Sequence, residues 1–188
     1  MVICSEREIY RYMGYPYGQE PGEAIREQVA RCREQIDNAA QPRSVFGILP
    51  LRFLGEDRLE LGDLTVQSRN LARHLRCCEQ AIVFAATLGV PVDRLIARAT
   101  AANIGEAVAM QAAAAALIEA YCDELHAEWS LAQEKQGWYL RTRFSPGYGD
   151  FSIRHQQDIL NRLEAAKRIG LTLTDSLLLV PVKSVTAV

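Results

Sequence analysis

The chain is organised around the stretch Arg143-Phe144-Ser145-Pro146-Gly147-Tyr148-Gly149-Asp150, its densest run of special-purpose residues. Pro146 fixes one backbone dihedral, while Gly147 and Gly149 adopt positive φ without a Cβ penalty. A Pro-Gly pair therefore makes a tight turn whose backbone groups can approach a ligand closely. A guanidinium, a phenol and a carboxylate flank this turn, so the stretch predicts a binding corner.

The residues before the turn alternate in polarity. One set points one way and the other set the opposite way, as in a strand: Trp138, Leu140, Thr142 and Phe144 against Tyr139, Arg141 and Arg143. A strand over 138–144 would deliver Arg143 to its polar face where the chain turns. We expect Arg143 to be the first charged group of the binding corner.

A long helix from about Ile104 to Trp129 is the predicted centre of the fold. It is alanine-rich and apolar on most sides, so other elements must surround it. Glu119 shares a face of this helix with small apolar residues such as Ala115 and Val108. An unpaired carboxylate is costly in such a place, so we expect Glu119 to be buried and to have a positively charged partner.

The remaining patterns predict an α+β fold: a long central alanine-rich helix packed with other helices against a twisted sheet. Because helices do not alternate strictly with strands, the sheet should be mostly antiparallel or mixed. Further helices are predicted at 5–13, from 21 through 36, from Ser68, from Pro91 and over 152–170, and strands at 44–49, 58–61, 81–86, 171–180 and 183–188. In the 152–170 helix, Ile159, Leu160, Leu163 and Ala166 should face inward.

Length and composition bound the function. A chain of 188 residues buries roughly 70% of its unfolded surface as one domain. We expect a single domain over 1–188, with a helical region at 1–42 and an α+β core at 43–188. The net charge of −2 and the lack of a basic stripe argue against nucleic acid. An early charged N-terminus, short apolar runs and five unpatterned cysteines predict a soluble cytoplasmic protein that does not bind membranes.

Several weaker motifs carry no function by themselves. Cys77-Cys78 near His74 suggests a metal or redox site, but without CxxC spacing plain core or surface thiols are favoured. Gly147-Tyr148-Gly149 lacks the further glycine of a dinucleotide fingerprint, which disfavours a Rossmann methyltransferase or dehydrogenase. His126 and His155 belong to no nucleophile motif, so both are expected on a surface or helix face.

Arg143 and Glu119 together suggest a ligand that carries both a carboxylate and an ammonium, such as an amino acid derivative. A guanidinium matches a carboxylate bidentately, and a buried glutamate needs a positive partner. The alternative is an internal Arg–Glu ion pair or two solvated side chains. Spacing alone favours that alternative, because many buried charges simply pair with each other.

Ordered motifs along the chain resemble the activation domain of cobalamin-dependent methionine synthase, in particular its stand-alone form. The matching segments are 143–150, 169–176 and 181–187, with upstream support at 68–75, 84–89 and 118–125. The resemblance covers about residues 60 to 188 in order. Several ordered motifs make it much more specific than the turn alone.

The resemblance implies binding of S-adenosylmethionine (AdoMet), which restores methylcobalamin on a partner corrinoid that has been oxidised to inactive cobalt(II). It places the methionyl carboxylate on Arg143, and the ammonium or a ribose hydroxyl on Glu119. Ser145 and Gly147 would offer turn backbone to the adenine. Tyr148 would shelter the ligand or contact the sulfonium by cation–π attraction.

The family pattern also implies partners: a corrinoid-binding methionine synthase chain, which carries the cobalamin, and a flavodoxin-like electron donor. This chain would be one component of a methyltransferase system for methionine biosynthesis, with no catalytic residue of its own and no bound metal. The chain departs from the family pattern at two positions. A further C-terminal tyrosine and an N-terminal acidic residue of the family's AdoMet site have no match here. These differences imply a shallower AdoMet site or one completed by a partner. The alternatives are a docking module that has lost AdoMet binding and, less favoured, an independent methyltransferase.

Overall fold

The computed structural model describes residues 4–188 and shows an α+β fold, as expected. Two helices, α1 (Glu6–Tyr12) and α2 (Glu23–Ala39), lead into β1 (Arg43–Phe53), β2 (Arg58–Leu61), β3 (Leu64–Gln67), α3 (Arg69–His74) and β4 (Gln80–Thr87). The helices α4 (Val90–Ala102) and α5 (Ile104–Glu134) follow, then α6 (His155–Arg162), α7 (Ala165–Ile169), β5 (Thr172–Leu173), β6 (Leu179–Val180) and β7 (Ser184–Ala187).

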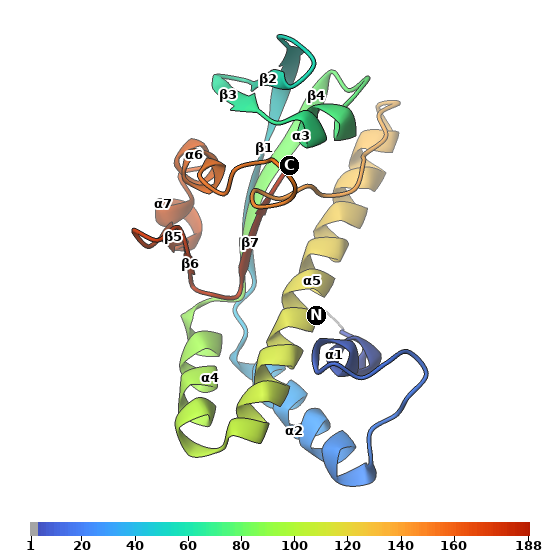
Figure 1. Ribbon diagram of the computed structural model, residues 1–188, viewed down its shortest axis with the longest axis vertical. Coiled ribbons are helices and arrows are strands. Elements are labelled where there is room, and N and C mark those ends of the chain that lie inside the picture. The colour runs from blue at the N-terminus through green and yellow to red at the C-terminus, as the bar shows by residue number, and fades with distance from the viewer. Residues whose placement is uncertain (1–3) are drawn as a thin grey trace.

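The main sheet has the order β3-β2-β1-β4-β7, and all of its neighbouring strands are antiparallel. In Figure 1 the sheet runs along the long axis of the molecule, with α5 beside it and α6 and α7 on the other side. The strands β5 and β6 form a separate two-stranded hairpin. The prediction of a mostly antiparallel sheet beside a long central helix is confirmed.

The strand β4, which lies between β1 and β7, is apolar from Ala81 to Ala86 because both of its faces are covered. Val83 and Ala85 are buried with β1, α6 and α7, while Phe84 and Ala86 are buried with α5. A strand of this kind reads as a continuous apolar run rather than an alternating one. The sheet thus separates two hydrophobic cores.

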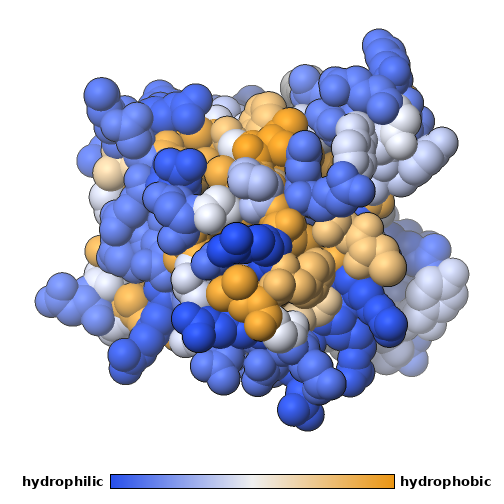
Figure 2. Space-filling view, turned by 90° about the horizontal axis from the view of Figure 1, so that it is seen from above, coloured by the Kyte–Doolittle hydropathy of each residue, from blue (hydrophilic) through white to orange (hydrophobic). Residues whose placement is uncertain are grey.

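The surface at one end of the molecule is apolar in its middle. Figure 2 views the end where β2, β3, α3 and the C-terminal turns of α5 lie, and there hydrophobic side chains gather within a rim of hydrophilic ones.

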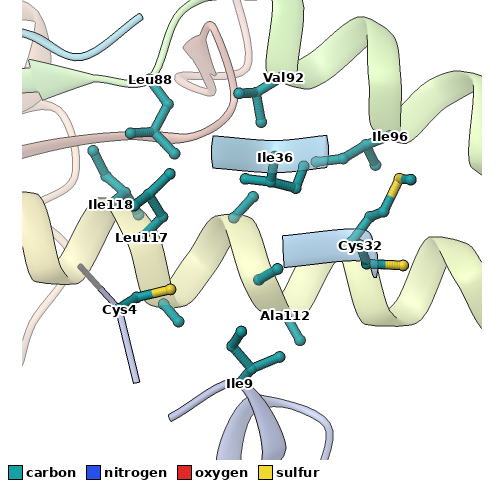
Figure 3. Close-up of a cluster of buried hydrophobic side chains, with 14 of the residues drawn as sticks. Cys4, Ile9, Cys32, Ile36, Leu88, Val92, Ile96, Ala112, Leu117 and Ile118 are labelled. Atoms are coloured by element: carbon teal, nitrogen blue, oxygen red, sulfur yellow. The ribbon is translucent and has the colours of Figure 1, made fainter. Parts of the chain in front are cut away.

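The first core surrounds α5 at the opposite end. Side chains from α1, α2 and α4 converge on its small residues, as Figure 3 shows for Ile9, Ile36, Val92, Ala112 and Leu117. Alanines let neighbouring helices approach the axis of α5 closely, which explains the alanine-rich sequence. Asn103 begins α5 by accepting hydrogen bonds from the N–H groups of Gly105 and Glu106. Among residues 4–188, no helix is both long and apolar enough to cross a membrane.

Three predicted elements differ from the structure. The 138–144 segment forms no strand, although Phe144 at its end makes two backbone bonds with Val188, which follows β7. The 152–170 helix is two helices, because Glu164 adopts left-handed φ between α6 and α7, and Ala166 is exposed while Ala165 and Ile169 are buried. The 171–180 strand folds back on itself as the β5–β6 hairpin.

Candidate functional site

The predicted corner is a compact turn. Gly147 has φ +97° and Gly149 has φ +54°, so both use the left-handed region that glycine permits. Gly147 N–H donates to the Phe151 carbonyl at 2.7 Å, and Tyr148 N–H donates to the Ser145 carbonyl at 3.1 Å. These bonds fold the backbone tightly around Pro146, as the sequence predicts.

Asp150 fastens this turn to the start of α3. Its carboxylate accepts hydrogen bonds from the Ser68 hydroxyl and from the backbone N–H groups of Arg69 and Asn70, the last two at 2.8 and 3.1 Å. The Ser68 hydroxyl is the largest cause of a lowered Asp150 pKa, and the two backbone donors lower it further. A Cβ at Gly149 would overlap the Asn70 side-chain amide, and its φ of +54° disfavours a side chain, so glycine fits here without displacing Asn70.

Ser68 serves two elements at once. Its hydroxyl donates to Asp150 and also accepts from Leu71 N–H at 3.0 Å, which caps α3 as expected. The sequence predicts the cap but not the link to Asp150, which lies far along the chain.

Arg143 lies against α5 and forms two ion pairs. Its Nη2 is 2.9 Å from Glu119 Oε2, and its Nη1 is 2.6 Å from Asp123 Oδ1. Glu119 and Asp123 are four residues apart and so lie on one face of the helix. Burial lowers the Arg143 pKa, but the Asp123 hydrogen bond and both carboxylates outweigh it and raise the pKa, so Arg143 stays charged.

The internal ion pair, one of the two interpretations of Arg143 and Glu119, is therefore present. The prediction that Glu119 is buried is wrong, because 45% of its side chain is exposed. The face of α5 that carries Glu119 is itself partly open to solvent, because Val108 is 49% exposed and Ala115 is only partly buried. Asp123 was missed, although its position one turn beyond Glu119 is the signal that could have identified it.

The other predicted site residues lie in the turn that follows Arg143. Ser145 is partly buried, whereas Gly147 and Tyr148 are exposed. The Tyr148 ring lies 6.2 Å from the Phe144 ring and is 69% exposed, so its outer face is open. Backbone bonds of 2.8 and 3.0 Å between Phe144 and Val188 fix the turn beside β7. Arg143, Ser145, Gly147 and Tyr148 thus form one corner, with Glu119 opposite.

The weaker motifs form no centre of their own. His155 bonds to Asp158 on its own helix at 2.9 Å, and Cys77 is exposed while Cys78 is partly buried. Within residues 4–188, no cluster of three or more histidines, cysteines and acids is arranged to hold a metal ion.

Comparisons with known proteins agree with this architecture. A family model described as "Vitamin B12 dependent methionine synthase, activation domain" matches residues 73–188, more than half of the chain. A solved structure described as "Crystal Structure of the MetH Reactivation Domain bound to AdoHcy" is similar with a TM-score of 0.71 and 18% identity, over 98% of this chain and 72% of that chain. No curated protein matches the chain.

Proposed function

Because the chain belongs to the activation-domain family of vitamin B12 dependent methionine synthase, we propose that it binds AdoMet and supports reductive remethylation of a partner's corrinoid. The solved relative of the same fold is described as bound to AdoHcy, the demethylated form of AdoMet. The observation that carries the proposal is the ion-paired corner of Arg143, Glu119 and Asp123 beside the glycine turn.

The corner fits the methionyl end of AdoMet by exchange of ion pairs. The ligand's carboxylate would replace Asp123 on Arg143, because Asp123 is the more exposed of the two acids at 71%. The ligand's ammonium would then meet Glu119, and the displaced Asp123 carboxylate would be solvated, since it is already 71% exposed. The residues present therefore suit the ligand, and the existing bonds hold the guanidinium in place before binding.

The turn suits the adenosyl end. Gly147 is exposed and has no side chain, Ser145 is small, and the Tyr148 ring has an open face for the ligand or its sulfonium. A corrinoid on the partner chain supplies the nucleophile that accepts the methyl group. This chain's residues bind AdoMet and orient its methyl group outward.

The proposal includes two partners: the corrinoid-binding methionine synthase chain and a flavodoxin-like electron donor. Five cysteines, all free in the described residues, support a reducing and cytoplasmic location.

Calorimetric titration with AdoMet tests the site. Arg143→Ala should weaken binding by roughly 2 kcal/mol or more, since it removes one partner of a charge-assisted pair. Arg141→Ala is the matched control: this arginine lies two residues earlier and donates to the Arg76 carbonyl instead. Equal affinity of wild type and Arg143→Ala would contradict the site.

Reconstitution tests the role. The chain, AdoMet, a reductant and a cobalt(II)-loaded methionine synthase core should together give the methylated corrinoid spectrum, which the Arg143→Ala form should not give. Equal methylation without the chain would overturn the proposal. Because Arg143 is already satisfied by internal ion pairs, a docking module without AdoMet binding is the second candidate, and an absence of calorimetric heat would favour it.

A further inference from the structure

A pocket of about 100 Å³ lies beside the corner, between the C-terminal turns of α5, the 138–143 segment and the sheet. Its floor is made by residues of β1 and β4, including Ile48, Ile82 and Phe84. It borders Arg143, but Glu119, Ser145, Gly147 and Tyr148 are not among its lining residues. The pocket is therefore separate from most of the proposed AdoMet site.

Aromatic rings form its walls. Trp129 of α5 and Trp138 line it together with Phe84. The Trp129 ring packs edge-on against Phe84 with centroids 5.1 Å apart, and it lies 4.9 Å from the Phe46 ring. Trp129 is thus fixed in place but only 7% exposed, so Trp138, which is 40% exposed, supplies most of the open ring surface.

Three polar side chains of the pocket are available to form hydrogen bonds with a ligand. His126, Gln133 and Gln80 line it, and within residues 4–188 none of their side chains has a hydrogen-bond partner. Each can offer both a donor and an acceptor, depending on tautomer for the histidine. Small-molecule sites combine apolar walls with a few such polar groups.

The charges at the pocket limit the ligand. The described lining residues include no Asp or Glu side chain to attract a cation. The guanidinium of Arg143 is occupied by two acids, and that of Arg141 donates to the Arg76 carbonyl at 3.0 Å. Because a carbonyl does not neutralise it, the Arg141 guanidinium keeps its positive charge, so a ligand that carries a positive charge is disfavoured.

Size narrows the class further. An enclosed apolar protein cavity of about 150 Å³ binds benzene. This pocket is smaller, at about 100 Å³, but it is open on one side, so it can hold one ring while the rest of the ligand stays at its mouth. We propose that this pocket binds a small, nitrogen-containing aromatic ring without positive charge, packed against the tryptophans with its polar edge toward His126 and Gln133. This site goes beyond the proposed function and does not depend on it.

The protein carries its own reporter for this site. The chain has two tryptophans, and both line the pocket. Purine, a neutral fused ring at pH 7.5, should quench tryptophan emission excited at the red edge, and the quenching should saturate. Benzamidine, a ring that carries a positive charge, should not. Quenching that rises linearly without saturation would overturn the proposal.

Two variants and a control locate the binding. Ile48→Phe should narrow the pocket and weaken purine binding at least tenfold, and Gln133→Leu should weaken it severalfold by removing the polar edge. Leu131→Phe is the matched control, since Leu131 is exposed on α5 outside the pocket. Equal binding by Ile48→Phe and wild type would contradict this location.

Saturating AdoMet separates the two sites. Purine binding should be unchanged in its presence, whereas competition would show that the pocket is part of the AdoMet site and would overturn the inference. A chain that binds purine but not AdoMet would refute the proposed function and leave this inference intact.

Discussion

Arg143 lies between two carboxylates whose positions give them different roles. Asp123 is largely exposed and holds the guanidinium at 2.6 Å, whereas Glu119 is half-exposed and 2.9 Å away. In the proposed exchange, the ligand carboxylate competes with Asp123 for Arg143, whereas the ligand ammonium is attracted to Glu119. The two acids should therefore affect AdoMet binding in opposite directions.

Asp123→Asn should tighten AdoMet binding about twofold to fivefold, the scale of an exposed ion pair. Glu119→Gln should weaken binding, because the ammonium loses its partner. Since Glu119 is half-exposed, this change should alter the free energy of unfolding by about 1 kcal/mol or less. Calorimetry and melting curves measure both effects, and a change of the same sign in both variants would refute ion-pair exchange.

Cys122 lies under this ion pair and is fully buried in α5. Burial is the main cause that raises its pKa from 9.0 to about 12, with Arg143 opposing and Glu119 and Asp123 adding to the rise. The folded state therefore holds the thiol proton more tightly than the unfolded state. That stabilisation is complete below pH 9 and is lost as pH rises toward 12.

Cys122→Ala should accordingly flatten the alkaline fall in the free energy of unfolding between pH 9 and 12. Denaturant melts across this range, on wild type and variant, provide the measurement. Thiol labelling of the folded wild type at pH 8 should modify Cys77 and Cys78 rapidly and the three buried cysteines slowly. Rapid labelling of Cys122 would contradict its burial.

At the scale of elements, the turn depends on α3. Asp150 bonds to Ser68 and to two backbone N–H groups, which join segments that are 80 to 82 residues apart. Because the folded pKa of Asp150 lies below 3.8, this clamp persists above that pH and is lost as pH falls through the lowered value.

Asp150→Asn should loosen the turn without unfolding the protein. Amide hydrogen exchange over residues 145–149 should accelerate, and AdoMet should bind more weakly because its contacts are less ordered. Asp63→Asn is the control, since Asp63 forms an exposed ion pair with Arg162 elsewhere. Unchanged exchange in Asp150→Asn would mean that backbone bonds alone hold the turn.

Sequence reasoning succeeded where local signals and burial agree. The cap at Ser68, the doubly covered strand β4 and the long helix α5 were all predicted, since each depends on patterns within one element. It failed where tertiary contacts decide. The 138–144 segment alternates like a strand but lies along α5, where Trp138 N–H bonds to the Gln133 carbonyl at 3.1 Å.

In the candidate site, too, local features could be predicted from the sequence and long-range contacts could not. The turn residues are adjacent in sequence and were predicted together. The ion pairs of Arg143 with Glu119 and Asp123 bridge 24 and 20 residues, so their geometry depends on how the segment packs on α5. The Asp150 clamp was missed because no local pattern links a turn to a distant helix start.

At the scale of the whole molecule, α5 joins the two ends. Its N-terminal half is enclosed by α1, α2 and α4, and its C-terminal half carries Glu119, Asp123 and the aromatic pocket. We propose that residues 1–188 fold as a single domain, because the helical region 1–42 covers the same helix that positions the site.

Deleting residues 1–42 tests whether the chain folds as a single domain. Ile9, Val29, Cys32 and Ile36 are at most 1% exposed and cover the apolar face of α5. At about 2 kcal/mol for each buried side chain, their loss removes on the order of 8 kcal/mol, comparable to the whole stability of a domain. Residues 43–188 alone should therefore lack a cooperative melting transition by circular dichroism and should bind no AdoMet. Val29→Ala in the full chain, which should cost about 2 to 3 kcal/mol, provides a graded comparison that remains folded. A truncated chain with an unchanged melting temperature would show that 43–188 is an independent core and that 1–42 is an accessory to it.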